Sequence, residues 1–391
     1  MSCLKKVLII HTDGNTFNNP TLKCIIDLLV GNSVFVTIRY PVSNAPMPST
    51  MGVKLLPWGR IYNKFKKLIY NYLTSWYFSF IIVYFEKAFI ISGNYDLIIA
   101  VDRVGLIEAA HLKKITGIPF VFFSFEIMFE CETSTAFKSL EKKASRDASY
   151  WFIQDEVRAK CLQRENALSF TNYSIVPLAS AGIGHMRPER LRDKLGIPVE
   201  KKVAILMGSL ANWSMAEDII GSTLGWPEDW VLVVHCRYGL THDFMKKSEM
   251  AITVPLAGKV YWSDEAPGMV DDLGYVLAGV SVGLAFYKVV GSCPYTGKNL
   301  EYLGLSSGKI ATYLRYGIPV IMNNIGLYSE LAKQHNFGIV LRDTEQIGGS
   351  LISINLDELS KNATNFFLAY LDFQKYKEDI WNIFNDIIKK E

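Results

Sequence analysis

Cysteine and histidine are both scarce in this sequence, and neither gathers into a cluster. The chain of 391 residues has six cysteines and six histidines. No two cysteines form a CxxC pair and no group of histidines accompanies them, which argues against a zinc site and against a disulfide framework. We therefore expect no metal site, and we expect the cysteines to be reduced and buried as small apolar side chains.

A strong charge excess is also missing, as is a long apolar leader. The formal net charge is only +3, whereas a DNA-binding domain is usually far more basic. The first apolar run covers residues 7–10 and stops at a His-Thr-Asp-Gly turn, so we interpret it as a buried strand and not as a signal peptide. These absences predict a cytoplasmic protein that does not bind nucleic acid.

What the sequence does contain is a globular composition and a length suited to two domains. Half of the residues are apolar and a fifth are charged, which is typical of folded proteins. The length itself suggests two domains, and a stretch rich in glycine and proline at 177–198 is the expected boundary. We predict one domain over residues 1–180, a second over 197–365, and a C-terminal helical segment over 366–391.

Short apolar runs alternate with helical stretches in both predicted domains. Near-continuous apolar strands separated by helices are typical of parallel sheets that helices cover on both faces. The predicted strands are 7–11, 33–39, 97–101, 119–123 and 151–154 in the first domain, and 202–207, 230–235, 259–262, 280–286, 319–322 and 338–341 in the second. The clearest predicted helices are 20–30, 105–116 and 307–316. The fold class is therefore α/β, with two Rossmann-like domains.

The segment 306–321 carries the strongest chemical signal: a turn of small residues, a helix, a glycine stop and a buried strand. Ser306, Ser307 and Gly308 fall where the helix begins, and free backbone N–H groups together with the helix dipole attract anions there. Lys309 adds a positive charge in the first turn, where a cation opposes the dipole. A bound anion would explain this lysine, and a solvated lysine after an ordinary N-cap is the alternative.

The same segment resembles the donor-binding segment of bacterial group-1, family-4-like glycosyltransferases, which have the GT-B fold. The matching residues are Ser307, Lys309, Tyr313, Leu314, Gly317, Pro319 and Val320. The paired glutamates of that family would fall on Gly304 and Thr312, so neither is kept. The second of these glutamates holds the nucleotide ribose in the family, and Glu301 is close enough in sequence to substitute. The resemblance implies two Rossmann-like domains facing across a cleft, with a C-terminal helix that packs back on the first.

The resemblance also suggests further contacts to a nucleotide-sugar donor. Gly208 and Ser209 end a strand similar to the first strand of the family's donor domain, where small residues let the backbone approach a diphosphate. Tyr261 and Trp262 lie in a segment similar to the one that lines the base, so either ring would stack on it, with core packing as the alternative. Arg237 ends a predicted strand and suits a phosphate contact or a surface salt bridge.

We expect the first domain to hold the acceptor. Asp13, Gly14 and Asn15 form a turn after the first strand, where GT-B proteins approach the acceptor. Asp102 and Glu126 each follow a later strand, and an inverting transferase needs a general base beside the acceptor hydroxyl. Asp102 is the first candidate for this base and Glu126 the second. Alternatively, Asp102 caps the helix that follows it or pairs with the neighbouring arginine.

The stretch 64–91 is basic at its start and rich in aromatic residues afterwards. Lys64, Lys66 and Lys67 precede an uncharged run over 68–85, which is at the lower limit of length for a membrane-spanning helix. A basic and then aromatic pattern is typical of helices that lie on a membrane surface. A helix that faces the core of the first domain is the alternative.

These features predict a glycosyltransferase that moves a sugar from a UDP- or GDP-sugar to a carbohydrate or lipid-linked acceptor, in bacterial surface glycan synthesis. No cofactor is expected, and the helix dipole with basic side chains would take the place of a metal. The enzyme would be cytoplasmic, or peripheral on the inner face of the plasma membrane. Two alternatives stay open: a catalytically silent GT-B binding subunit, and a sugar-nucleotide 2-epimerase with carboxylates and histidines in its site.

Overall fold

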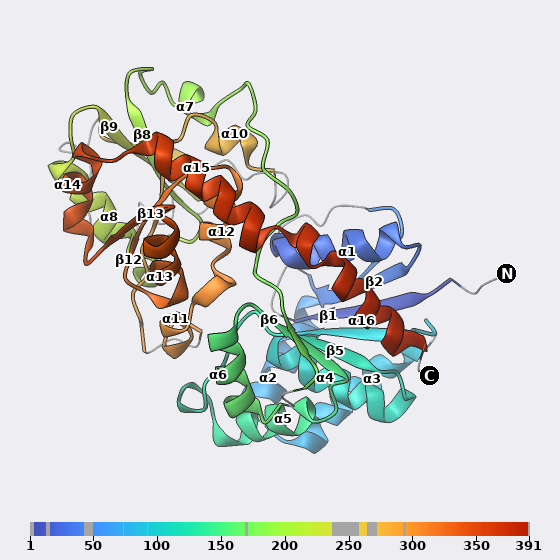
Figure 1. Cartoon of the computed structure of the whole chain (residues 1–391). Coiled ribbons are helices and arrows are strands. Elements are labelled where there is room, and N and C mark those ends of the chain that lie inside the picture. The colour runs from blue at the N-terminus through green and yellow to red at the C-terminus, as the bar shows by residue number, and fades with distance from the viewer. Residues whose placement is uncertain are drawn as a thin grey trace. The chain divides into compact units, whose positions relative to one another are not determined.

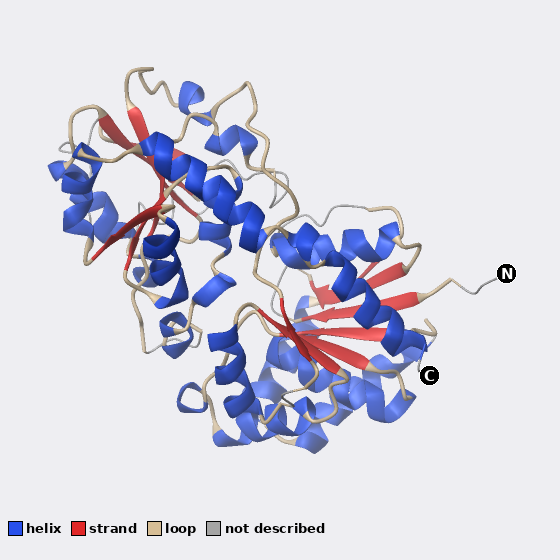
Figure 2. Cartoon of the chain, viewed as in Figure 1, coloured by secondary structure: helices blue, strands red, loops and turns tan. Residues whose placement is uncertain are grey.

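The computed structural model describes residues 4–12, 16–42, 50–72, 74–91, 93–168, 171–236, 258–263, 272–291 and 295–389. The chain forms two compact units, Met1–Leu178 with Phe373–Glu391, and Ala179–Asp372 (Figure 1). Each unit is built around one parallel sheet, with helices on both faces of the sheet (Figure 2).

In the first unit, the described residues form a sheet of seven strands in the order β3-β2-β1-β4-β5-β6-β7. The strands are β1 (Lys6–His11), β2 (Phe35–Pro41), β3 (Val53–Trp58), β4 (Leu97–Val101), β5 (Phe120–Phe123), β6 (Tyr150–Ile153) and β7 (Tyr173–Ile175). The helices are α1 (Pro20–Gly31), α2 (Arg60–Tyr72), α3 (Trp76–Ile91), α4 (Asp102–Thr116), α5 (Thr135–Ser145), α6 (Glu156–Asn166) and α16 (Lys377–Lys389). β4 and β5 are buried along their whole length, which is why they appear in the sequence as continuous apolar runs.

Glycines set the packing and the end of α4. At Gly105, an added Cβ would lie only 2.8 Å from the backbone oxygen of Ile10 in β1, so a side chain there would push the helix off the sheet. The helix ends at Gly117, whose φ of 79° is the left-handed conformation of a C-cap. This end of α4 is confirmed as predicted from the sequence.

The second unit contains a sheet of six strands among the described residues, in the order β10-β9-β8-β11-β12-β13. The strands are β8 (Lys202–Met207), β9 (Trp230–His235), β10 (Val260–Ser263), β11 (Val282–Ala285), β12 (Val320–Asn323) and β13 (Gly338–Leu341). The helices are α7 (Leu191–Lys194), α8 (Ala216–Ser222), α10 (Gly274–Leu277), α11 (Lys298–Glu301), α12 (Gly308–Arg315), α13 (Gly326–His335), α14 (Ile347–Ile352) and α15 (Leu356–Phe366). Apolar side chains pack into one core cluster on each face of this sheet.

The end of the chain belongs to the first unit. After α15 and a π-helical turn over Phe367–Leu371, the chain enters α16. Lys5 Nζ donates a hydrogen bond to Asn385 Oδ1 at 2.7 Å, and the ring of Phe384 meets the rings of Phe123 and Phe152 edge to face. α16 is therefore held to the first sheet by polar and apolar contacts together.

Three features of the first unit differ from the sequence prediction. The edge strand β3 and the three-residue strand β7 were not predicted, because β3 is largely half-buried or exposed and β7 is too short to show a pattern. The uncharged run 68–85 is not one helix, since α2 ends at Tyr72 and α3 begins at Trp76.

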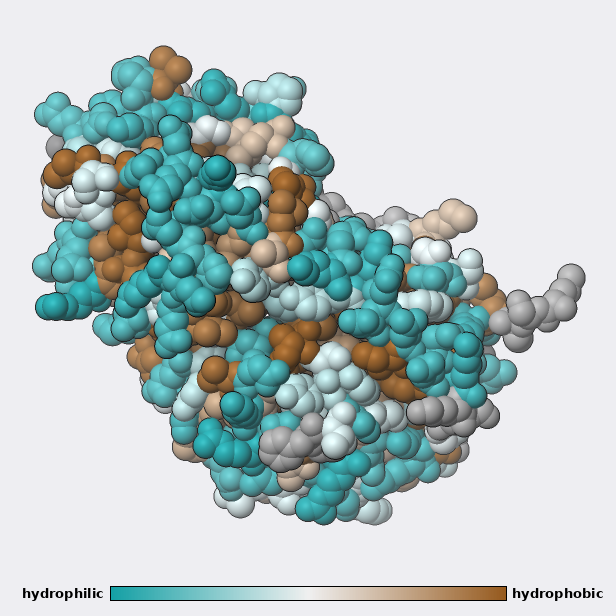
Figure 3. All heavy atoms as spheres, in the orientation of Figure 1, coloured by the Kyte–Doolittle hydropathy of each residue, from teal (hydrophilic) through white to brown (hydrophobic). Residues whose placement is uncertain are grey.

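Within the described residues, no helix is both long and apolar enough to cross a membrane. On the face drawn in Figure 3, hydrophilic side chains predominate over the helices.

Candidate functional site

Both sheets contain a point where the strand order reverses, between β1 and β4 in the first unit and between β8 and β11 in the second. Open α/β sheets bind ligands beyond the carboxyl ends of the strands at such a switch point. In the second unit, Gly208 follows β8 with a φ of 106°, a conformation that favours glycine. The Cε atom of Lys309 lies 3.6 Å from where a Cβ of Gly208 would be. The fold thus brings together two predicted donor residues that are far apart in the sequence.

The start of α12 is fixed by the two serines predicted there. Ser307 is the N-cap, and its Oγ accepts a hydrogen bond from the backbone N–H of Ile310 at 3.3 Å. The same Oγ lies 2.6 Å from the hydroxyl of Tyr287, and the Ser306 hydroxyl donates to the Leu303 carbonyl. Both side chains therefore serve the fold, and it is the first backbone N–H groups of α12 that helix geometry leaves available to an anion.

Lys309 supplies a buried cation at this helix start. The residue as a whole is half-buried, but its Nζ is enclosed and forms no hydrogen bond with any described residue. The Nζ lies 5.5 Å from the centre of the Tyr287 ring, and burial lowers the pKa of Lys309 to about 8. A buried ammonium without a partner is unfavourable in itself, so this group is suited to an anionic ligand.

Tyr287, Tyr313 and Asn323 hold the surroundings of Lys309 in place. The Tyr313 hydroxyl donates to the Ile205 carbonyl and accepts from the Met207 N–H, both at 3.2 Å. The Asn323 side chain bonds both backbone groups of Tyr287, at 3.0 and 2.7 Å. Burial raises the pKa of Tyr287 to about 12, so its hydroxyl stays neutral. The sequence showed Tyr313 only as a motif match, and no local signal marks Tyr287 or Asn323 as a support.

The remaining predicted donor contacts are less closely gathered. Arg237 lies outside the described residues. Tyr261 and Trp262 are half-buried on opposite faces of β10, each packed against a different core cluster, so core packing accounts for both rings. Glu301 is exposed at the end of α11.

The two positions of the missing family glutamates have local roles of their own. Gly304 has a φ of 50°, and its backbone N lies 3.1 Å from where a Cβ of Gly326 would be. Thr312 donates its hydroxyl to the Gly308 carbonyl at 2.7 Å, within α12. A glutamate at Gly304 would therefore be strained, because side chains rarely adopt that backbone conformation.

In the first unit, Asp102 stands at the switch point as the first residue of α4. Its φ of 53° is left-handed, a conformation that Asp tolerates better than most residues. Its Oδ1 accepts the backbone N–H groups of Phe125 and Glu126, at 2.8 and 3.0 Å. Asp102 is buried and Glu126 is exposed. The structure thus brings the two predicted carboxylate residues together, but the contact is between the carboxylate of Asp102 and the backbone N–H of Glu126. Asp13, Gly14 and Asn15 lie outside the described residues.

Two further side chains hold the loop that follows β5. Gln154 Nε2 donates to the Ser124 carbonyl, and Arg158 Nη2 donates to the Phe125 carbonyl, both at 2.8 Å. Arg158 Nε also donates to Gln154 Oε1 at 2.8 Å. Burial lowers the pKa of Arg158, against the opposing effect of nearby carboxylates that include Glu126. The polar segment after β6 is therefore structural and orients the backbone beside Glu126.

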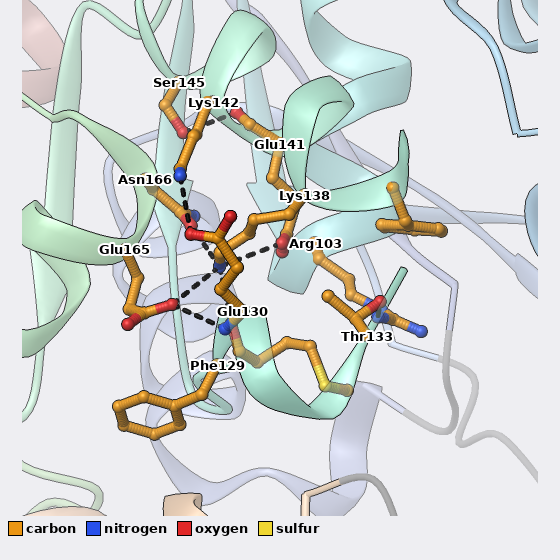
Figure 4. Close-up of polar contacts among 12 residues, drawn as sticks. Arg103, Phe129, Glu130, Thr133, Lys138, Glu141, Lys142, Ser145, Glu165 and Asn166 are labelled. Carbon is orange, nitrogen blue, oxygen red and sulfur yellow. Dashed lines mark hydrogen bonds and ion pairs between the residues drawn. The ribbon is translucent and has the colours of Figure 1, made fainter. Parts of the chain in front are cut away.

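A buried lysine fixes the other end of this loop (Figure 4). Lys138, in α5, donates to the Met128 carbonyl and to Asn166 Oδ1, and it pairs with Glu141 at 3.1 Å. Glu165 accepts the backbone N–H of Glu130 at 2.7 Å. Lys138 is only 1% exposed. We did not find this cluster from the sequence, where Lys138 is one of several lysines in an ordinary helix.

Two Rossmann-like units, each with a ligand-binding switch point, are the architecture of the GT-B fold, and comparison with solved structures confirms that fold. The chain is similar to sucrose-phosphate synthase from Thermosynechococcus elongatus, with a TM-score of 0.69, 10% identity, and coverage of 99% of this chain and 100% of that chain. It is similar to HepE from Anabaena in complex with UDP and glucose, with a TM-score of 0.68, 14% identity, and coverage of 98% and 100%.

A third similar structure is WaaG, a glycosyltransferase involved in lipopolysaccharide biosynthesis, with a TM-score of 0.63, 10% identity, and coverage of 96% of this chain and 99% of that chain. At such low identities the likeness establishes the fold and not the reaction. No protein-family profile matches the chain, and no curated protein sequence matches it significantly.

Proposed function

We propose that this chain is a glycosyltransferase that moves a sugar from a nucleoside-diphosphate sugar to a carbohydrate or lipid-linked acceptor. The observation that carries the proposal is the enclosed, unpartnered ammonium of Lys309 at the start of α12, beside Gly208 at the switch point of the second sheet. A diphosphate would complete this site, because it accepts hydrogen bonds from both the ammonium and the helix N–H groups.

The donor would be held by groups of the second unit. Lys309, the backbone at Gly308 and the Gly208-Ser209 turn would bind the diphosphate, with Arg237 as a further contact. The helix dipole and the ammonium would stabilise the departing diphosphate without a metal ion and without a cofactor. A UDP-sugar is the favoured donor, because HepE has been solved with UDP and glucose; a GDP-sugar is the second choice.

The nucleoside would be contacted by Glu301 and by an aromatic ring of β10. Glu301 is exposed and is therefore available to the ribose, in place of the family's second glutamate. Either Tyr261 or Trp262 would meet the base with the part of its surface that lies outside the core, since the two side chains lie on opposite faces of β10.

The acceptor would bind to the first unit beside the loop after β5. We propose Glu126 as the general base in preference to Asp102, since the Oδ1 of Asp102 already accepts two backbone N–H bonds, whereas Glu126 is exposed. Asp102 would then position Glu126. Asp13, Gly14 and Asn15, which follow β1 in the sequence, are proposed as further acceptor contacts.

The setting would be bacterial surface glycan synthesis, at the cytoplasmic side of the plasma membrane. The role of WaaG in lipopolysaccharide biosynthesis supports this setting. A catalytically silent GT-B subunit is the second candidate, because Gly304 and Thr312 replace the family's paired glutamates. Such a subunit would bind the nucleotide sugar without turning it over.

The proposal is tested with a panel of UDP- and GDP-sugars. Ligand binding to the folded state raises the melting temperature, so at least one nucleotide sugar should raise it in a concentration-dependent way. The donor identified in this way is then incubated with candidate acceptors, and nucleoside diphosphate release is measured. No shift with any nucleotide sugar would refute the proposal, and binding without release would favour the silent subunit.

A further inference from the structure

Helices α2 and α3 turn large apolar side chains toward solvent. Ile61 is 87% exposed, and Phe65 and Leu68 lie exposed on the same helix. On α3, Tyr77, Tyr84 and Phe85 are 60–70% exposed. Monomeric soluble proteins rarely gather large apolar side chains on one surface, and such gatherings mark interaction sites. We refer to these six side chains and the cations between them as the outer face of α2 and α3.

Two charged side chains of these helices are turned inward. Lys66 and Glu86 are 3% and 4% exposed, and their charged groups lie 3.2 Å apart. Lys66 also pairs with Glu108 of α4 at 2.7 Å, and Glu86 pairs with Arg39 of β2 at 3.3 Å. Of the three lysines in the membrane-surface interpretation, Lys66 therefore faces the core as the alternative interpretation has it, because its ammonium ties α2 to α3 and α4. Charged side chains of an amphipathic helix in a soluble protein usually face solvent.

The exposed charges on the outer face are all positive. Arg60, Lys64 and Lys67 are exposed on α2. The one acidic residue in the sequence of the two helices is Glu86, which is buried. The outer face thus combines apolar and aromatic side chains with three cations, and among the described residues the two helices contribute no exposed acidic side chain.

We infer that the outer face of α2 and α3 docks on an anionic lipid bilayer. Aromatic and aliphatic side chains enter the interface between headgroups and acyl chains, while lysine and arginine pair with anionic headgroups. A second copy of this chain fits less well, because a two-fold interface presents the same patch from both sides and would bring the three cations against three more. The inference rests on the proposed function only in that a lipid-linked acceptor would be met at such a surface.

The experiment measures binding of the full chain to sedimenting vesicles, without nucleotide. The vesicles are phosphatidylcholine alone or phosphatidylcholine mixed with phosphatidylglycerol. We expect binding to the mixed vesicles at low salt, weaker binding in high salt because salt screens the charges, and little binding to phosphatidylcholine alone. Absence of binding to the mixed vesicles at low salt would overturn the inference.

Two variants locate the surface. Replacing Arg60, Lys64 and Lys67 with Gln should lower the partition coefficient about 100-fold, since each cation near an anionic surface contributes roughly a fivefold factor. Replacing Phe65 and Phe85 with Ser should weaken binding in both low and high salt. The matched control replaces three exposed lysines on other helices, Lys160, Lys333 and Lys361, with Gln.

The outcomes separate this inference from the proposed function. Two results would show that the outer face is not the docking surface. One is that the control variant loses as much vesicle binding as the variant with Gln at Arg60, Lys64 and Lys67; the other is that the latter variant binds vesicles like the wild type. A dimer in light scattering that the Phe65 and Phe85 substitutions abolish would instead make this face an interface between copies. Nucleotide-sugar binding by thermal shift is measured on the same preparations, so a failure of the proposed donor site is seen independently.

Discussion

At the switch point of the first sheet, buried polar groups form hydrogen bonds with one another. At the switch point of the second sheet, the ammonium of Lys309 has no hydrogen-bond partner in the described part of the chain. Asp102 accepts two backbone N–H bonds, and nearby Lys138 bonds a carbonyl, an amide and a carboxylate. Lys309, in contrast, is enclosed without a hydrogen-bond partner among the described residues. A satisfied buried network stabilises and rigidifies the structure, whereas an unpaired buried charge destabilises it. The first network therefore shapes a loop, and the second site presents a buried cation that suits an anion.

This difference leads to opposite expectations for substitutions at the two sites. Loss of a group from the first network should lower the free energy of unfolding. Loss of the Lys309 charge should leave the free energy of unfolding unchanged or raise it, and should lower the affinity for an anion. Measuring stability and binding on the same variants tests the comparison directly.

The largest effect on stability is expected for Lys138→Met. The substitution removes the ammonium that pairs with Glu141, which is 2% exposed, and removing one partner of a buried ion pair lowers stability by about 3–5 kcal/mol. Denaturant unfolding measures the change. Lys142→Met is the control, because its pair with Glu130 is exposed and exposed ion pairs contribute little to stability. Equal effects of the two substitutions would contradict the clamping role of Lys138.

The largest effect on turnover is expected for Glu126→Gln. If this carboxylate takes the acceptor proton, its loss should lower kcat by about 100-fold or more, while donor affinity stays near wild type. Asp102→Asn keeps the size of the side chain but weakens the acceptor of two backbone bonds, so it should reduce both stability and kcat. If Asp102→Asn alone abolished turnover in a stable protein, Asp102 would be the base. Steady-state kinetics with calorimetric donor binding distinguish the two cases.

The Lys309→Met substitution tests the second switch point. Nucleotide affinity should fall by roughly 1.5–3 kcal/mol, the contribution of a hydrogen bond to a charged group. Stability should change little or rise slightly, because a buried unpaired cation has been replaced by an apolar side chain of similar length. Lys333→Met, at an exposed position of α13, is the control for affinity. Unchanged nucleotide affinity by calorimetry would remove Lys309 from the donor site.

The smallest expected effect is the pH dependence of nucleotide binding. The pKa of Lys309 is lowered by burial to about 8, so above that pH the free protein loses the proton that an anion requires. Affinity should be level below pH 8 and then fall, by at most about tenfold per pH unit. The stability of the ligand-free protein should rise over the same range, since the unfolded chain retains its lysine proton there. Lys309→Met should abolish both trends; calorimetry and unfolding curves across this range measure them.

The elements that the sequence predicts well are those in which one strong local signal is enough. β4, β8, β9 and β13 have the predicted bounds, because each is a short apolar run between polar or glycine-containing turns. α12 lies within its predicted bounds because a serine N-cap and a glycine stop mark its ends. β3 was missed because half-burial at a sheet edge leaves no apolar run.

The candidate sites depend on contacts that no local pattern contains. Lys309 and Gly208 are about a hundred residues apart in the sequence. Only the fold shows that they lie together and that the ammonium of Lys309 is enclosed. The basic stretch before α3 does not show which of its lysines is buried, so the membrane-surface interpretation grouped Lys66 with Lys64 and Lys67. The donor and acceptor assignments of individual residues stay predictions until binding and turnover are measured.

The loop after β5 keeps its shape only together with the side chains that hold its backbone. Its backbone is held by Asp102, Gln154, Arg158 and Lys138, which come from before and after it in the chain. A graft of residues 124–130 alone into a related scaffold would therefore lose its shape. Glu126 is part of this arrangement, because its backbone N–H bonds to Asp102 and its carboxylate acts on the charge of Arg158. Under the proposed function, the transplantable module is therefore the loop together with the side chains that hold it.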